Sequence, residues 1–223
     1  MAVSRDVVIW RDDFMRAQAF TTTPGEKGWT IKDTSAAGTP TYLCVSDDSG
    51  AAKLLCDNTS EAQIVTLFHN DVLAFRLDKL LSVTWNVQVA GVDAVTTLVY
   101  GVADEQNATS DTVQFNAWFR MEGSVSTSLV VVETDDDVTN NDDKATGVSL
   151  AAAYKRCTID FSYGLTDVRF FIDGARVSSA NTFSMNASPS QRVQPYVQLQ
   201  KASGTGVPAF VADYVEIVTR TAS

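Results

Sequence analysis

The chain has 223 residues, of which 45% are hydrophobic, and it carries 17 basic and 27 acidic residues for a formal net charge of -10. This apolar content excludes an intrinsically disordered chain, and the absence of clustered Lys and Arg argues against nucleic-acid binding. No stretch approaches the roughly 18 uninterrupted apolar residues that a membrane span requires. Met1 to Asp13 lacks the pattern of a signal peptide, so we expect a protein made and folded in a cytoplasm.

The first 40 residues are richer in turn-forming residues than the rest of the chain. Thr21–Gly28 and Asp33–Pro40 are predicted to be surface loops that follow a first strand. Residues 1–40 therefore form either a loop-rich surface region or an arm that docks on a neighbouring molecule. No linker or repeat divides the remainder, so we expect a single domain over residues 1–223.

Period-two alternation of apolar and polar residues dominates the sequence and predicts strands with one buried face. Apolar side chains alternate with polar ones at four places, namely Val83–Val89, Gln114–Arg120, Cys157–Phe161 and Val197–Gln200. Four further segments are apolar on both faces, which indicates burial between layers or contact with a partner; they are Val95–Ala103, Val125–Glu133, Val168–Ile172 and Phe210–Val218.

Turn residues separate these strands. Asp173-Gly174 predicts a tight type I′ hairpin, because Asp and Gly accept the positive φ angles of that turn. Ser49-Gly50 is predicted to join strands Tyr42–Ser46 and Ala52–Cys56. Asp12–Phe20 and Val148–Tyr154 are the candidates for a short turn or helix. The pattern predicts an all-β fold, a two-sheet antiparallel sandwich with very little helix.

Residues with catalytic or metal-binding chemistry are sparse. Cys44, Cys56 and Cys157 are expected to be buried thiols in a reducing compartment, a Cys44–Cys56 bridge being the alternative. His69, the sole histidine, is expected in a loop or at a sheet edge. The sequence therefore predicts no catalytic set, no zinc site and no phosphate-binding loop.

The acidic segment Glu133–Asp143 has two interpretations. Its density of oxygen ligands suits a weak Ca²⁺ site, although it lacks the glycine and glutamate of an EF-hand loop. The alternative is a solvated loop between two strands. A rise of the melting temperature with Ca²⁺ would distinguish them.

The same segment also begins the Glu-x-Asp-x-x-Glu pattern of glucanases. Glu133 and Asp135 match the pattern, but Val138 replaces the second essential carboxylate. We therefore expect no enzymatic activity.

Trp118 falls on the polar side of its predicted strand, together with Gln114, Asn116 and Arg120. An aromatic ring beside amides suits a sugar-binding face, and Trp with Arg suits a protein interface. Burial beneath a loop is the third reading. These four residues form the candidate interaction face.

The sequence resembles the concanavalin-like, or laminin-G-like, jelly-roll superfamily. Val168–Val177 resembles its recurrent strand, Asp-Gly turn and strand, and Phe210–Val218 resembles its closing strand. Asp12–Arg16 followed by Gly28–Thr30 is similar to its opening. The resemblance implies a jelly-roll sandwich.

More narrowly, the chain resembles jelly-roll proteins of tailed-phage particles. The stretches that carry this resemblance are Leu73–Asp78, Asn116–Arg120, Val131–Asp136 and Gln194–Gln198. It implies a non-enzymatic capsid decoration protein on the virion surface, a homotrimer that binds the major capsid protein and is assembled in the host cytoplasm. The alternative is a lectin-like module that binds glycans, also on a particle.

Overall fold

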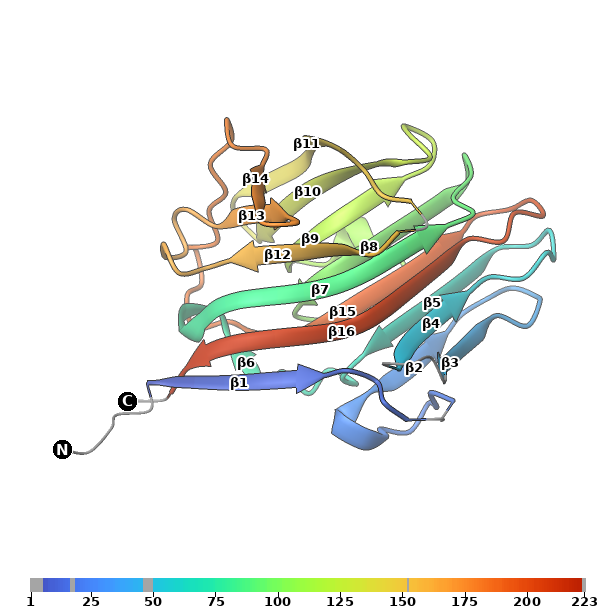
Figure 1. Ribbon diagram of the computed structural model, residues 1–223, viewed down its shortest axis with the longest axis horizontal. Helices are drawn as coiled ribbons and strands as arrows, with labels where there is room; N and C mark the ends of the chain where they lie inside the picture. Colours follow the sequence, from blue (N-terminus) through green and yellow to red (C-terminus); the bar gives the residue numbers. More distant parts are fainter. Residues whose placement is uncertain (1–5, 17–18, 46–49, 152, 222–223) are drawn as a thin grey trace.

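A computed structural model describes residues 6–16, 19–45, 50–151 and 153–221. They form two antiparallel sheets that pack face to face (Figure 1). The predicted jelly-roll sandwich is confirmed. Short 3₁₀ turns provide the helical structure in these ranges, at Glu26–Gly28, Leu77–Lys79 and Ser110–Thr112. None of the helices found in this part of the chain is long and apolar enough to cross a membrane.

The first sheet, sheet A, contains both ends of the described chain. The strand β1 (Val7–Asp12) pairs with the last strand along six residues, from Val7 opposite Arg220 to Asp12 opposite Val215. The strands of sheet A follow the order β14 (Ala175–Val177), β13 (Arg169–Ile172), β12 (Lys155–Asp160), β7 (Leu80–Ala90), β16 (Ala209–Arg220), β4 (Ala51–Leu55) and β3 (Thr41–Val45), with β1 beside β16.

The second sheet, sheet B, carries the acidic segment and the candidate face. Its strands follow the order β11 (Asn140–Ser149), β10 (Leu129–Asp136), β9 (Phe115–Glu122), β8 (Thr96–Ala103), β15 (Arg192–Lys201), β5 (Gln63–Phe68) and β2 (Thr30–Asp33), with β6 (Phe75–Arg76) beside β15.

The main hydrophobic core fills the space between the sheets, because alternate side chains of each strand point inward. The aromatic side chains of Trp85, Phe119 and Phe210 are fully buried there. Tyr100 stacks on Phe119 with ring centroids 5.4 Å apart. Cys44, Cys56 and Cys157 are free buried thiols, as the sequence predicted.

The Asp173-Gly174 hairpin is also confirmed. Asp173 has φ of 50° and Gly174 has φ of 82°, and the turn joins β13 to β14. The strands β3 and β4 pair as predicted, but Ser49 lies outside the described residues, so the turn itself stays a prediction.

Two expectations need correction. Of the two alternatives for Asp12–Phe20 and Val148–Tyr154, a short turn or a helix, the helix is absent from their described residues. Glu133–Asp143 is not a loop, because β10 extends to Asp136 and β11 begins at Asn140. His69 lies in the connection after β5, as expected, and it is 6% exposed because the rings of Trp10 and Trp29 pack against it.

Candidate functional site

The outer face of sheet B holds the candidate interaction face. Alternation along β9 points Phe119 into the main core and directs Asn116, Trp118 and Arg120 outward, as the sequence predicted. Gln114 precedes β9 and is exposed. Trp118 is fully buried despite its outward direction.

Residues 104–114, here called the face loop, cover this part of sheet B. The Asn107 carbonyl accepts hydrogen bonds from Gln198 Nε2 at 2.6 Å and from Tyr196 Oη at 3.3 Å. The backbone N–H of Gln106 donates to Asp71 at 3.0 Å. The loop is therefore fixed to β15 and to the β5–β6 connection.

A second apolar cluster forms beneath the face loop. Trp118 stacks on Tyr196 with centroids 6.0 Å apart, and Gly101 leaves room for the indole, since a Cβ there would come within 2.8 Å of the Trp118 Cβ. The cluster comprises Phe68, Val99, Ala103, Val113, Trp118 and Tyr196. It explains why Val95–Ala103 is apolar on both faces: one face meets the main core and the other meets the loop.

The position of Trp118 agrees with the third reading, burial beneath a loop. Its ring cannot stack on a sugar in this conformation, and Asn116 donates to the Val113 carbonyl at 3.2 Å. A partner contact through these four residues stays a prediction, and it would require the face loop to move.

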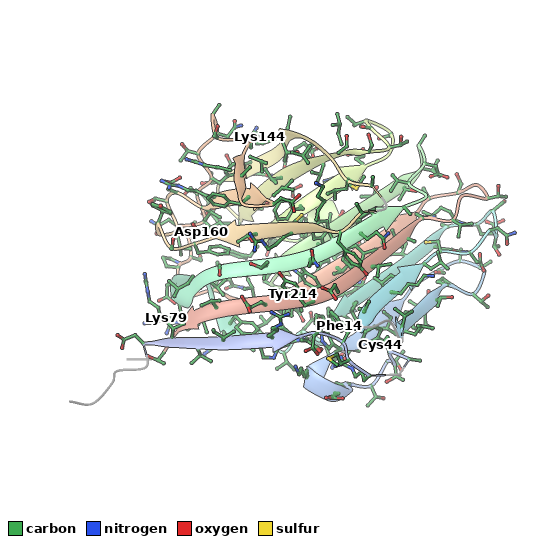
Figure 2. All side chains as sticks on the ribbon, viewed as in Figure 1. Phe14, Cys44, Lys79, Lys144, Asp160 and Tyr214 are labelled. Atoms are coloured by element: carbon green, nitrogen blue, oxygen red, sulfur yellow. The ribbon has the colours of Figure 1, made fainter. Side chains whose placement is uncertain are left out.

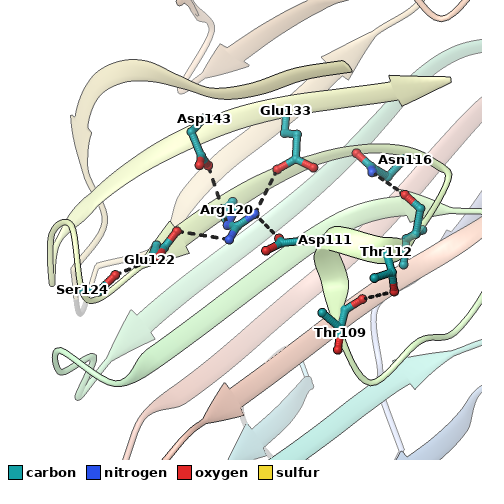
Figure 3. Close-up of polar contacts among 10 residues, drawn as sticks. Thr109, Asp111, Thr112, Asn116, Arg120, Glu122, Ser124, Glu133 and Asp143 are labelled. Carbon is teal, nitrogen blue, oxygen red and sulfur yellow. Dashed lines mark hydrogen bonds and ion pairs between the residues drawn. The ribbon is translucent and has the colours of Figure 1, made fainter. Parts of the chain in front are cut away.

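Arg120 lies at one end of the covered region, among four acidic side chains (Figure 3). Its Nη2 is 3.1 Å from Glu122, its Nη1 is 3.4 Å from Glu133, and its Nε is 3.7 Å from Asp143. Nη1 also donates to Asp111 of the face loop. Strands β9, β10 and β11 and the face loop thus converge on one guanidinium.

A polar cavity of about 270 Å³ opens beside this guanidinium, and we call it the Arg120 pocket. Arg120 is only 7% exposed, and its Nε has no hydrogen-bond acceptor among the described residues. The pocket is lined by Asp111, Arg120, Glu122, Glu133, Asn140, Asp142 and Asp143.

Burial shapes the electrostatics of the pocket. Desolvation raises the pKa of Glu133 to about 7, although the Trp118 side chain and the Arg120 charge act in the opposite direction. Burial likewise raises the pKa of Asp143. Burial alone would lower the pKa of Arg120, but the hydrogen bond to Asp111 and the nearby carboxylates raise it well above its usual value. The guanidinium therefore stays charged.

Asp136, unlike Glu133 and Asp143, accepts hydrogen bonds from backbone N–H groups and does not pair with Arg120. It is 1% exposed, its Oδ1 accepts from the N–H groups of Val138 and Thr139, and its Oδ2 accepts from Ala187 at 2.9 Å. This carboxylate stabilises the turn that reverses the chain between β10 and β11.

The described residues contain no cluster of His, Cys, Asp or Glu with the arrangement of a metal site. In the acidic segment, Asp136 bonds to backbone N–H groups, and Arg120 stands between Glu133 and Asp143. The weak Ca²⁺ site at residues 133–143 stays a prediction.

The sequence identified only part of the Arg120 pocket. Arg120 belongs to the predicted candidate face, whereas Glu133, Asn140, Asp142 and Asp143 belong to the predicted acidic segment, and the sequence did not connect the two. Asp111 and Glu122 were missed, because a face-loop residue and a strand-end residue meet Arg120 only in three dimensions. The alternation along β9 could have predicted the contact with Glu122, since it places Arg120 and Glu122 on the same outward side of the strand.

Comparison with known proteins gives structural but not sequence relatives. No protein-family model matches the chain, and no curated protein matches it. A protein of unknown function from Shewanella oneidensis MR-1 superposes with a TM-score of 0.64 at 11% identity, over 100% of this chain and 92% of the other.

Two other solved structures are carbohydrate-related. The carbohydrate recognition domain of Emp47p has a TM-score of 0.58 at 8% identity, covering 99% of this chain and all of that domain. A glycoside hydrolase family 16 protein from Bacteroides ovatus, solved with a glucan product, has a TM-score of 0.61 at 13% identity, covering 93% and 99%. The fold is a concanavalin-like jelly roll. At these identities the likeness establishes the fold alone, and it gives no support for the phage-particle resemblance.

Proposed function

We propose that this protein binds glycans without hydrolysing them and that the Arg120 pocket takes part in the binding. The observation that carries the proposal is a polar cavity on the outer face of sheet B, built around a guanidinium that is 7% exposed. Carbohydrate-recognition domains and glycoside hydrolases share this fold, which supports a sugar ligand.

The pocket chemistry suits hydroxyl groups. Carboxylates such as Asp142 and Asp143 accept hydrogen bonds from hydroxyls, and the Asn140 amide both donates and accepts. Hydrogen bonds to charged groups are stronger than neutral ones, so a few of them give useful affinity. The lining contains no exposed aromatic ring, so the pocket favours polar contacts over stacking.

Hydrolysis is disfavoured by the arrangement of the carboxylates. Glu133 is 3% exposed and shares the Arg120 guanidinium, and the position of the second glucanase carboxylate holds Val138, which is 80% exposed. A retaining glycosidase requires two carboxylates about 5 Å apart that both reach the scissile bond. This arrangement supports the proposal of a lectin rather than an enzyme.

A glycan array followed by titration tests the proposal. The double variant Asn140→Ala/Asp142→Ala removes two exposed lining residues, and Asn58→Ala/Glu61→Ala is the matched control in the β4–β5 connection. Two lost hydrogen bonds, each contributing about 0.5–1.5 kcal/mol, should weaken binding by about fivefold to a hundredfold. Equal glycan binding by both variants, or the absence of any bound glycan, would refute the proposal that the Arg120 pocket binds glycans. Release of reducing ends from mixed-linkage glucan would refute the absence of hydrolysis.

The second candidate is a particle decoration protein, in which the chain docks as a trimer on the major capsid protein. Exposed apolar residues on the edge strand β1 favour it, namely Val7 (44%), Val8 (48%) and Ile9 (62%). Light scattering of the purified chain tests this candidate. A stable trimer supports it, and a monomer that fails to bind empty capsids removes it.

A further inference from the structure

A second, larger cavity of about 610 Å³ opens between the two sheets, and we call it the interlayer cleft. Its walls come from β1 and the end of β16 in sheet A, and from β6, Arg192 and the β5–β6 connection in sheet B. Figure 2 places Lys79 at this end of the sandwich. The cleft shares no lining residue with the Arg120 pocket.

One wall of the cleft is apolar. Val8 and Trp10 line the cleft, and Trp10 pairs with Ile217, whose side chain is in the main core. Trp10 contacts Phe75 edge-to-face at 5.9 Å and His69 at 5.2 Å. Val72 and Ala74 extend this surface. An apolar chain would find a preformed contact here.

The rim of the cleft is cationic. Five basic residues and no acidic residue line it, although the whole chain has an excess of acidic residues; the five are Lys27, Arg76, Lys79, Arg192 and Arg220.

Local partners neutralise only part of this charge. Arg76 pairs with Asp78 at 2.7 Å, and Lys27 lies 3.7 Å from Asp12. Lys79, Arg192 and Arg220 have no carboxylate partner among the described residues. A local positive potential therefore remains in a protein of net charge -10.

His69 adds an unused polar atom to the wall. The ring borders the cleft and is 6% exposed, and its Nε2 has no hydrogen-bond partner in the described structure. Burial lowers the pKa of His69 to about 4, with the Asp12 charge acting in the opposite direction, so the ring is neutral at pH 7. Buried polar atoms without partners are uncommon in folded proteins.

We propose that the interlayer cleft binds a small organic anion, a carboxylate joined to an apolar chain. The chain packs on Trp10 and Phe75, and the carboxylate lies toward Lys79 and Arg220. Arg192 already donates to the carbonyls of Leu73 and Ala74. Charge complementarity carries this assignment, because a neutral ligand would leave Lys79 and Arg220 without a counter-charge and a polar anion would leave the apolar wall exposed. The proposal is independent of glycan binding.

Calorimetric titration with sodium octanoate, and with octanol as the neutral probe of equal chain length, tests the proposal on the full chain. Octanoate should bind more tightly than octanol. The double variant Lys79→Gln/Arg220→Gln should weaken octanoate binding about fivefold to thirtyfold, because each partly exposed ion pair contributes up to about 1 kcal/mol. Its octanol binding should not change.

Two further variants make the test decisive. Lys32→Gln/Lys53→Gln removes the same charge away from the cleft and should bind octanoate like the wild type. Ala74→Trp obstructs the cleft at an exposed position and should abolish binding of both probes. No octanoate binding by the wild type, equal binding of octanol, or unchanged binding by Ala74→Trp would each overturn the proposal.

Discussion

Arg120 is surrounded by carboxylates. Its removal should therefore destabilise the fold by more than the loss of its own hydrogen bonds would. Glu133 is 3% exposed and would be left without its cation. Breaking a buried pair in this way destabilises proteins by about 3–5 kcal/mol. We expect Arg120→Met to lower the free energy of unfolding by about 3 kcal/mol, measured by urea denaturation at about pH 8, where Glu133 of the wild type is mostly ionised.

Two variants separate charge from packing. Adding Glu133→Gln to Arg120→Met removes the unpaired carboxylate and should recover at least about 1 kcal/mol. Lys32→Met, at an exposed position on β2, should change the stability by less than about 0.5 kcal/mol. Equal losses in Arg120→Met and in the double variant would show that the buried charge does not matter.

Glu133 also predicts a pH dependence. Its pKa is about 7 in the folded protein, against an ordinary value of 4.5, because burial disfavours the charged form. Between these pH values the folded state binds more protons than the unfolded state, so rising pH destabilises the protein by up to about 3 kcal/mol through this group. Arg120, Asp142 and Asp143 are the charges that act on it.

The Glu133→Gln variant isolates this contribution. Urea denaturation at about pH 5 and about pH 8 should show a smaller loss of stability in the variant than in the wild type. Asp104, whose pKa burial raises to about 6, contributes to both proteins and cancels in the comparison. Identical pH dependence in the two proteins would contradict the raised pKa of Glu133.

At the scale of elements, the β13–β14 hairpin depends on one glycine. Gly174 has φ of 82°, and a Cβ there would meet its nearest atom, Arg156 Nη2, at an ordinary 3.7 Å. The cost of substitution is therefore backbone strain. Gly174→Ala should lose about 1–2 kcal/mol in urea denaturation, and Gly174→Asn should lose less, because Asn tolerates this conformation. A fully stable Gly174→Ala would show that the turn does not need glycine.

The strands were largely predictable because their side chains alternate. Val83–Val89 and Phe210–Val218 lie within β7 and β16. The strand β11 was not predicted, because its first half is charged and shows no alternation of apolar and polar residues. Its outer edge has no neighbouring strand in sheet B as described. A strand at the edge of a sheet can be charged, so it need not show an apolar pattern.

The face loop was not predictable, and the candidate site was therefore predicted only in part. Its main anchor is the Asn107 carbonyl, a backbone atom present at every residue and invisible in a side-chain pattern. When the loop is not taken into account, the alternation along β9 predicts that Trp118 and Arg120 share one exposed face. With it, Trp118 becomes core and Arg120 gains Asp111.

At the scale of the molecule, net charge and edge exposure act together. The charge of -10 keeps molecules apart at pH 7, and it vanishes near the sequence pI of about 4.5. Strand β1 pairs with β16 along one side, and its side chain Ile9 is 62% exposed. An apolar edge strand is a template for pairing with another chain. We therefore expect reversible self-association that is strongest near pH 4.5, measured by light scattering across pH.

The variant Ile9→Lys should suppress this association, because a lysine on an edge strand opposes pairing with a second copy. Val125→Lys is the matched control: Val125 is 78% exposed but lies in a turn between β9 and β10, and the substitution makes the same change in net charge. Suppression by both variants alike would mean that overall charge alone governs association. Suppression by Ile9→Lys alone would place the contact at β1, the strand on which the decoration candidate also depends.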